Sequence, residues 1–396
     1  MKLNERLNTP ISSAELERRW RLTRAAMEAA EIDVLLMQAN NDFMGGYPKW
    51  FTDNPSTQGY ADIVTFPIDD GMTIISQGPF GLDQRIPAEG DGFRRGVTRV
   101  LTAAFYASAR FCHQYDAELT LEALQPYAKG IIGMIGLSTL STYLIDYLRE
   151  KMPQARFVDA SDLVDQIKAI KSPEEIKVIR GVAALQDRAM EAAFDAFEPG
   201  KRDRDITAAA EYVSLQLGSE QGLYMCASAP IGSPTPFRNR HFQNRVIQPG
   251  DQMAILIENS GAGGYYCEIG RTATLGAATD AMHKEFEFAL QARAFMLELL
   301  RPGESCPAIW QAYNDFMDSH GKPKEDRLHC HGMGYDLVER PLVRFDEPMI
   351  LQAGMVVSCH PTFFTDSGLH WVCDNFLIGE DKTERLHAFP EKIVEL

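Results

Sequence analysis

Ionisable side chains interrupt the apolar stretches in the second half of this 396-residue chain. They are Glu258, Glu268, His331, His360 and Asp374. A buried charge without a partner is costly, so each of them needs an ion-pair partner, a metal ion or a catalytic role. Because side chains along a strand alternate between two faces, all five can converge on one face of a sheet. The chain therefore has to fold around a polar site inside an otherwise apolar sheet.

The segments around these residues predict an α+β domain over 159–396. Ser172 is expected to cap a helix that has Pro173 at its first position and that ends at Pro199-Gly200. Further helices, which share apolar residues at helical spacing, are expected near 204–217, 280–300 and 307–319. Apolar strands such as "QMAILIE" and "MVVSCHPTFF" lie between and after them. Few helices separate these strands, which favours an antiparallel sheet with helices packed on it.

Residues 1–158 predict a separate α/β domain. Short apolar strands such as "DVLLMQ" and "IIGMIGL" alternate with helices, one of them near Ser138–Lys151. The segment 46–60 is rich in Gly, Pro and Asn, so we expect a loop there. Tyr47 and Trp50 lie in that loop.

The charge and the cysteine content limit the partners and the cellular compartment that we expect for this chain. The chain has 55 Asp and Glu against 39 Lys and Arg, a net charge of −16, which disfavours binding to nucleic acid. No apolar run approaches the roughly 18 residues of a membrane span. The first residues lack the apolar core of a secretory signal, and the seven cysteines show no disulfide framework. We therefore expect a cytoplasmic protein with reduced thiols, whereas the charge says little about small-molecule substrates.

Four separated stretches resemble one known superfamily. They are "VDASDLVDQIKAIKSPEEIKVIRGVAALQDRAMEAAFDAFEPG", "QPGDQMAILIENSGAGGYYCEIGRT", "HCHGMGYDLVERP" and "AGMVVSCHP". Their order and spacing are similar to those of the creatinase/prolidase/aminopeptidase P/methionine aminopeptidase catalytic domain, through residues 155–380. The N-terminal α/β domain resembles that of the creatinase and prolidase branch. The resemblance implies a pita-bread fold for the C-terminal domain, an active site on the concave face of its sheet, and a homodimer.

The metal ligands of this superfamily fall on substituted positions. Its metalloenzymes hold two divalent ions with two Asp, one His and two Glu, and the resemblance places these ligands at Glu258, Glu268, His331, His360 and Asp374. Only His331 is unchanged, although every replacement is a residue type that can bind a metal. The set is therefore either an altered site for one divalent ion (Mn, Fe, Co or Zn) or an acid/base cluster without metal. In both cases Glu268 and His331 are candidate catalytic residues.

Peptidases of the superfamily carry a second His in a "VHExP" pattern. In this chain the slot reads "LVERP", so that Val338 replaces the His while Glu339 and Pro341 match. Those peptidases use this His to orient the scissile region, so the resemblance disfavours a standard prolidase or aminopeptidase P mechanism. Glu339 remains a candidate catalytic residue.

Further candidates flank these motifs. His241, in "RNRHFQNRV", resembles the upstream catalytic His of creatinase and aminopeptidase P, and a pKa near neutrality suits a proton shuttle. Arg238 and Arg340 are candidates for binding a substrate carboxylate, and Tyr47 and Trp50 for binding an alkylated ammonium group. The alternatives are solvated loop residues or, for Arg340, an ion pair with one of the glutamates of the site.

Four cysteines each precede a residue of the expected site: Cys267, Cys330, Cys359 and Cys373. Neighbours on a strand point to opposite faces, so these cysteines are expected to be small apolar residues behind the sheet.

The motifs favour a hydrolase that cleaves a C–N bond of a small non-peptide or modified amino-acid substrate, in the manner of creatinase. Three alternatives stay open. They are a divergent metal-dependent Xaa-Pro dipeptidase or aminopeptidase, a lyase of the dimethylsulfoniopropionate-lyase type, and a non-catalytic pita-bread binding protein.

Overall fold

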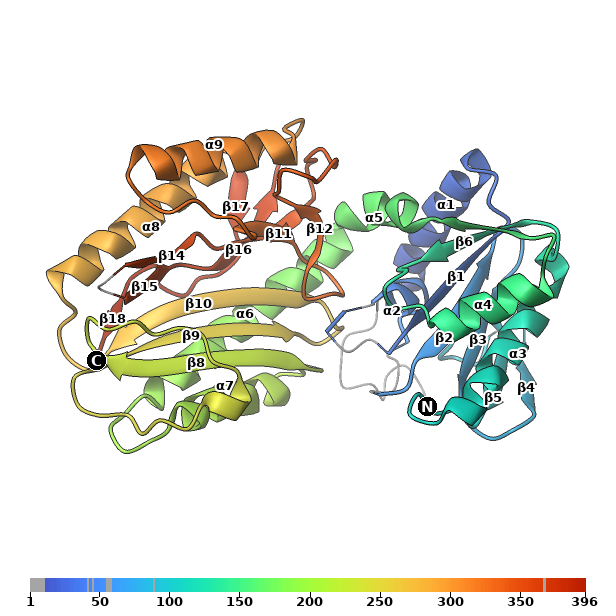
Figure 1. The fold of residues 1–396 in the computed structure, drawn as a ribbon, viewed down its shortest axis with the longest axis horizontal. Helices are drawn as coiled ribbons and strands as arrows, with labels where there is room; N and C mark the ends of the chain where they lie inside the picture. Colours follow the sequence, from blue (N-terminus) through green and yellow to red (C-terminus); the bar gives the residue numbers. More distant parts are fainter. Residues whose placement is uncertain (1–10, 41–42, 45, 55–58, 88–89, 366–367) are drawn as a thin grey trace. The chain divides into compact units, whose positions relative to one another are not determined.

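The structure, a computed structural model, describes residues 11–40, 43–44, 46–54, 59–87, 90–365 and 368–396. The chain forms two compact units, Met1–Lys168 and Ala169–Leu396. The first is an α/β unit and the second an α+β unit, which confirms the predicted fold class (Figure 1). None of the helices in the described part of the chain is long and apolar enough to cross a membrane.

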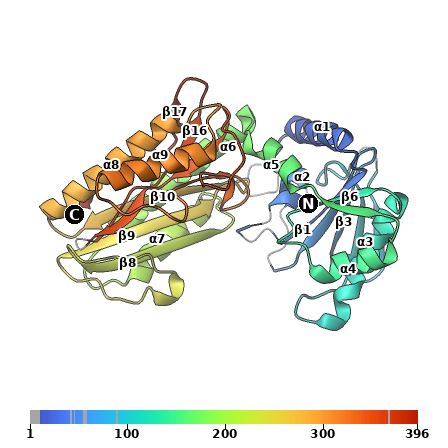
Figure 2. The same cartoon turned by 45° about the horizontal axis from the view of Figure 1, so that its top comes forward.

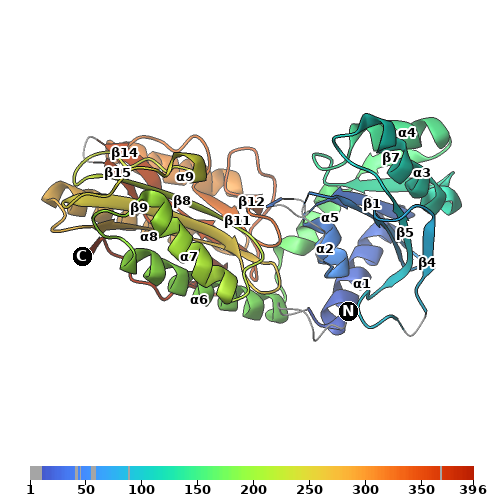
Figure 3. The same cartoon turned by 90° about the horizontal axis from the view of Figure 1, so that it is seen from below.

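The N-terminal unit is built on a mixed seven-stranded sheet in the order β4-β5-β3-β2-β1-β6-β7. Its strands are β1 (Val34–Ala39), β2 (Asp62–Pro67), β3 (Met72–Gln77), β4 (Leu82–Arg85), β5 (Val97–Ala103), β6 (Ile131–Ile135) and β7 (Arg156–Asp159). Its helices are α1 (Ser13–Ala29), α2 (Tyr47–Thr52), α3 (His113–Leu124), α4 (Thr142–Lys151) and α5 (Ser161–Ala169). Helices α3 and α4 cover one face of the sheet and α1 and α2 the other (Figure 3).

The segment around Tyr47 is helical, and the expectation of a loop there is wrong. Helix α2 has Pro48 in its first turn, where a missing backbone N–H costs nothing. Trp50 is only 2% exposed and Phe51 is fully buried against Phe66. The turn-forming residues of this segment therefore flank a short buried helix.

The C-terminal unit contains two main antiparallel sheets and a hairpin. The first sheet has the order β18-β10-β9-β8 and the second β12-β11-β13-β16-β17. The strands are β8 (Gly222–Pro230), β9 (Asp251–Ser260), β10 (Tyr266–Thr274), β11 (Cys330–Gly332), β12 (Glu339–Leu342), β13 (Val356–Cys359), β16 (Asp374–Ile378), β17 (Thr383–Arg385) and β18 (Val394–Glu395). The hairpin is formed by β14 (Thr362–Thr365) and β15 (Gly368–Trp371).

Helices cover the outer faces of both sheets (Figures 1 and 2). Helices α6 (Pro173–Asp195) and α7 (Asp203–Gln216) pack against β8–β10, and α8 (Asp280–Leu299) and α9 (Cys306–Ser319) pack against the second sheet. The sequence predicts the start of α6 well, because the Ser172 side chain accepts from the Glu175 N–H and the Glu175 carboxylate accepts from the Ser172 N–H. The concave faces are thereby left to form a site.

The two sheets meet at Gly270. Its N–H donates to the carbonyl of Cys373 at 3.1 Å, which joins β10 to the start of β16. A Cβ at Gly270 would lie 1.6 Å from Cη2 of Trp371, so only glycine allows the indole to pack over the strand here. Glu268, two residues earlier on β10, is thereby held against the second sheet, since its N–H donates to Asn375 Oδ1 at 2.6 Å.

Candidate active site

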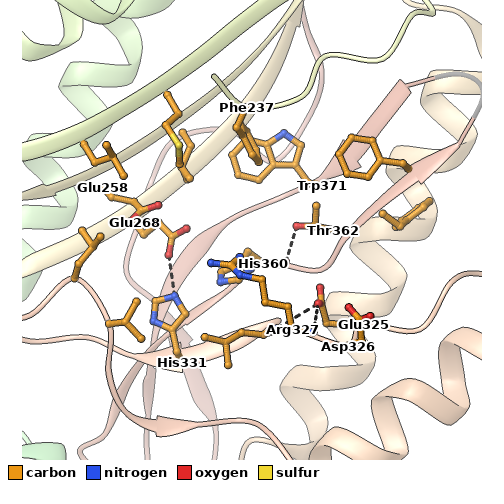
Figure 4. A pocket seen from close by; sticks show the side chains of 18 of the residues that line it. Phe237, Glu258, Glu268, Glu325, Asp326, Arg327, His331, His360, Thr362 and Trp371 are labelled. Carbon is orange, nitrogen blue, oxygen red and sulfur yellow. Dashed lines mark hydrogen bonds and ion pairs between the residues drawn. The ribbon is translucent and has the colours of Figure 1, made fainter. Parts of the chain in front are cut away.

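A cavity of about 750 Å³ lies between the two sheets of the C-terminal unit. Its polar side is formed by Glu258, Glu268, His331 and His360, four of the five residues predicted to converge. Its apolar side is formed by residues of β8, β9, the hairpin and two loops, among them Met225, Phe237, Leu256, Phe363 and Trp371. Figure 4 shows the two sides facing each other. A small molecule would contact ionisable and apolar groups at the same time, as is usual in ligand sites.

Three side chains of the polar side form a compact cluster. One ligand atom each of Glu268, His331 and His360 lies within 4.8 Å of the others. Glu268 comes from β10 and His331 from β11, while His360 directly follows β13. The pairing of Cys330 with Cys359 across β11 and β13 places the two histidines on neighbouring strands, with ring centroids 5.2 Å apart.

Hydrogen bonds orient the side chains of the cluster. Nδ1 of His331 lies 3.0 Å from the carbonyl of Gly332, to which it donates, and Nε2 of the same ring lies 3.3 Å from Glu268 Oε2. Burial favours a protonated Glu268, but His360, His331 and Ser358 outweigh it and hold the pKa of Glu268 at about 2. Burial lowers the pKa of His360. The cluster therefore consists of one carboxylate and two imidazoles.

This cluster fits one divalent metal ion. Glu268 Oε2 is buried and accepts no hydrogen bond from the described residues, although Nε2 of His331 lies 3.3 Å away. A cation between these atoms would satisfy both. Two His and one Glu form a known ligand set for Zn²⁺ that leaves one position open. Within the described residues it is the one group of three or more His, Cys, Asp or Glu with this geometry.

Glu258 faces the cavity beside the cluster. It is paired directly with Glu268 across β9 and β10. Burial and the neighbouring Glu268 carboxylate raise the pKa of Glu258 well above its usual value. Two adjacent carboxyl groups with pKa values shifted in opposite directions are typical of an acid and its partner base or ligand.

Asp374 does not join the other four residues, and the expectation of convergence is wrong for it. Its carboxylate pairs with Arg271 at 2.6 Å, Arg293 at 2.5 Å and Arg385 at 2.8 Å. Burial raises its pKa, but the arginines outweigh that effect and hold the pKa at about 2. Asp374 is thus the centre of a buried arginine cluster behind the sheet.

The reason is the alternation of side chains at the start of β16, which is offset by one residue from the expected alternation. Cys373 packs with Leu256 and Trp371 on the cavity side, and its Sγ lies 3.3 Å from Ser358 Oγ. Asp374, the next residue, consequently points to the opposite face. The other three cysteines lie behind the sheets as expected: Cys267 faces Ile179 of α6, and Cys330 and Cys359 belong to the core under α9.

Glu339 and Arg340 have partners away from the cluster. Glu339 pairs with Lys171 at 3.1 Å and also accepts from the N–H of Asp336. Arg340 pairs with Glu347 at 2.6 Å. Neither residue lines the cavity. Val338, at the position of the second His of the peptidases, does line it.

The remaining candidates also lie outside the cavity. His241 and Arg238 are exposed on the segment that precedes β9. Tyr47 donates to Asp165 Oδ1 at 2.6 Å within the N-terminal unit, and Trp50 is buried there next to Arg19. The structure therefore assigns structural contacts to the two aromatic residues.

Several residues of the site are not predicted from the sequence. Ser358, which contacts Glu268, is two residues before His360 and shares its strand face, so alternation offers a signal for it. Arg327 lies in the loop before β11, and Phe237 in the loop after β8. Loop residues have no periodicity, so the sequence carries no signal for these two.

Comparison with known proteins identifies the family of the chain. Residues 177–380 match the metallopeptidase family M24. The Xaa-Pro dipeptidase of Pyrococcus furiosus is 25% identical over 253 residues, which is 63% of this chain and 71% of the relative. An "uncharacterized hydrolase/peptidase" of Sinorhizobium fredii is 26% identical over 394 residues, 97% of this chain and 98% of the relative.

Two solved structures show the same fold over 96% and 98% of the chain. The Xaa-Pro dipeptidase of Bacillus anthracis has a TM-score of 0.76 at 17% identity and covers 96% of this chain and 100% of its own. The dipeptidase PepE of Mycobacterium ulcerans also has a TM-score of 0.76, at 18% identity, and covers 98% and 99%. These likenesses confirm the predicted pita-bread fold with an N-terminal domain. The chain therefore belongs to the metallopeptidase family M24, as a hydrolase of the creatinase/prolidase superfamily.

Proposed function

We propose that this protein hydrolyses a C–N bond in a small non-peptide or modified amino-acid substrate, and that it does so with one divalent ion. The observation that carries the proposal is the cluster of Glu268, His331 and His360, whose ligand atoms lie within 4.8 Å of one another. Val338 supports a non-peptide substrate, because an apolar side chain lines the cavity where the peptidases of the superfamily have a His.

In the proposed hydrolysis, different side chains of the cavity have different roles. When bound by the cluster, a divalent ion supplies Lewis acidity toward a carbonyl oxygen and acidifies water. Glu258 holds a proton on its carboxyl group at the cavity surface and can pass it to the leaving nitrogen. The Asn375 side chain and Ser358 orient Glu268. The apolar side keeps bulk water from the substrate.

A second candidate is a divergent Xaa-Pro dipeptidase. It is favoured by the names of two relatives, the Xaa-Pro dipeptidases of Pyrococcus furiosus and Pyrococcus horikoshii, each 25% identical to this chain. In this superfamily that activity goes with two ions. The number of bound ions therefore separates the two candidates.

The test combines metal analysis with a substrate panel. Purified protein is loaded in turn with Mn²⁺, Fe²⁺, Co²⁺ and Zn²⁺, dialysed, and measured by mass spectrometry for metal per chain. Each form is then assayed for amine release from N-carbamoyl and N-acyl amino acids and from Xaa-Pro dipeptides. We expect one ion per chain and turnover in the first group. Two ions with turnover of Xaa-Pro dipeptides would replace this proposal with the second candidate.

Variants connect the activity to the cluster. Glu268→Gln is expected to lower kcat/KM by about 10² or more and to lose the ion. His283→Gln is the matched control, because His283 is exposed on α8 and away from the cavity. An unsaturated product would instead indicate a lyase. Ligand binding without any turnover would indicate a binding protein.

A further inference from the structure

The loop 322–328 between α9 and β11 forms one side of the cavity and is held firmly in place. Asn314 on α9 is 1% exposed and binds both backbone groups of Glu325, since Oδ1 accepts from its N–H at 2.8 Å and Nδ2 donates to its carbonyl at 3.1 Å. Lys322, at the start of the loop, pairs with Glu285 of α8. The loop is therefore a built part of the site.

The carboxylate of Glu325 fixes the backbone of the residues that follow. Its Oε1 accepts from the N–H groups of Arg327 at 2.8 Å and Leu328 at 3.2 Å. In this arrangement a side-chain oxygen satisfies two backbone N–H groups of its own loop. Glu325 consequently orients Arg327 without pairing with its guanidinium.

Arg327 extends from this loop into the cavity. Figure 4 shows its side chain reaching across His360 toward the cluster, with Phe237 and Trp371 on the other side of the pocket. Among the described residues, no carboxylate forms an ion pair with the guanidinium. An arginine at this place presents a planar donor group that matches the geometry of a carboxylate.

We infer that Arg327 binds a carboxylate of the substrate, and that the substrate is an amphipathic carboxylic acid whose apolar part packs against Phe237 and Trp371. This inference rests on the proposed function, because it places the scissile C–N bond between that carboxylate and the cluster. The two rings lie 4.4 Å apart in a T-shaped arrangement that forms a rigid apolar surface. Arg327 then acts as a specificity-determining residue.

The competing interpretation makes Arg327 an internal counter-charge for the glutamates of the cavity. In that case its removal would weaken the cluster, and acids and amides would be affected alike. Recognition of a carboxylate requires instead that only the acid loses affinity. The comparison of an acid with its amide therefore separates the two interpretations.

The first experiment measures binding and does not depend on turnover. The full-length zinc-loaded protein is titrated calorimetrically with 3-phenylpropionate and with 3-phenylpropionamide. We expect the acid to bind at least about 10-fold more tightly than the amide, as a charge-assisted hydrogen bond implies, and Arg327→Met to abolish this difference. Lys284→Met, which removes an exposed cation of α8 outside the cavity, is the control and should retain it. Equal or undetectable binding of the two compounds to the wild type, or a difference that survives in Arg327→Met, would overturn the inference.

The second experiment uses hydrolysis of matched carboxylate and carboxamide forms of the panel compounds. Arg327→Met should lower kcat/KM for the carboxylate about 10- to 100-fold, mainly through KM, and leave the carboxamide unchanged. Circular dichroism checks that substitution of this exposed residue leaves the fold intact. If no compound is hydrolysed while the acid still binds through Arg327, the proposed function fails and the carboxylate site stands. Equal hydrolysis of both forms would leave the proposed function intact and refute the role of Arg327.

Discussion

Replacement of Asp374 by Asn separates a structural carboxylate from a metal ligand. The resemblance places a ligand at this position, whereas the structure places its carboxylate between Arg271, Arg293 and Arg385. The side chains of Asp374 and Arg271 are fully buried. An amide at this position keeps the shape of the side chain but leaves the arginine charges without their anion.

The size of the effect follows from the pKa and from burial. A carboxyl group whose pKa falls from 3.8 to about 2 on folding contributes roughly 2–3 kcal/mol at neutral pH. Removal of one partner from a buried ion pair costs roughly 3–5 kcal/mol, because the remaining charge stays buried. For a unit of this size, that loss lowers the unfolding temperature by roughly 6–20 °C.

The assay is thermal and urea unfolding followed by circular dichroism, together with metal analysis. Asp374→Asn should unfold at the lower temperature and still bind one ion per chain at low temperature. Asp346→Asn is the control, since Asp346 pairs with Arg344 on the surface and should leave the midpoint nearly unchanged. A variant that keeps its stability and loses the ion would refute this reasoning and make Asp374 a ligand.

Further predictions concern residues around the site. Stability supplied by Asp374 should be complete above about pH 4 and disappear as the pH falls through about 2, so the urea midpoint should fall between pH 5 and pH 3; a midpoint equally pH-dependent in Asp374→Asn would contradict this. Gly270→Ala should destabilise the unit by about 1–3 kcal/mol or more in urea unfolding, because its Cβ collides with Trp371, and an unchanged midpoint would show that the indole moves. Glu339→Gln should cost about 2 kcal/mol in the same assay and keep the bound ion, whose loss would assign Glu339 to the site. His241→Gln should leave kcat/KM unchanged, since His241 is exposed outside the cavity, and a large loss would restore its role as a proton shuttle.

Local signals in the sequence predict most of the fold. The cap at Ser172, the proline at the next position and the apolar spacing define α6, and similar signals define α7, α8 and α9. These features depend on neighbours within a few residues, so they can be read directly from the chain. The short helix α2 has no comparable signal, because its flanking turn residues are the same as those of a loop.

Strand alternation predicts the site residues only where the sequence also shows which face of the strand points toward the cavity. Glu258 and Glu268 are directly opposite each other, and the pattern of β9 and β10 shows their shared face. Before β16 the pattern "VCD" allows either face to be the cavity side, and the contact of Cys373 with Gly270 decides it. That contact joins two sheets that are distant in sequence. Alternation alone therefore misplaces Asp374 by one residue.

The electrostatics of the cavity relate the proposed binding of an ion to the proposed binding of a substrate carboxylate by Arg327. Within the cluster, Glu268 supplies the one carboxylate, and the other two members are imidazoles. A divalent ion would exceed the charge of that carboxylate, and Arg327 adds another positive charge to the same cavity. A second divalent ion next to the first would be opposed by repulsion between the cations, and the Asp374 carboxylate is engaged by arginines behind the sheet. A substrate carboxylate at Arg327 would offset part of the positive charge of the ion and the guanidinium, so the histidine at position 360 and recognition of an acidic substrate would share an electrostatic origin.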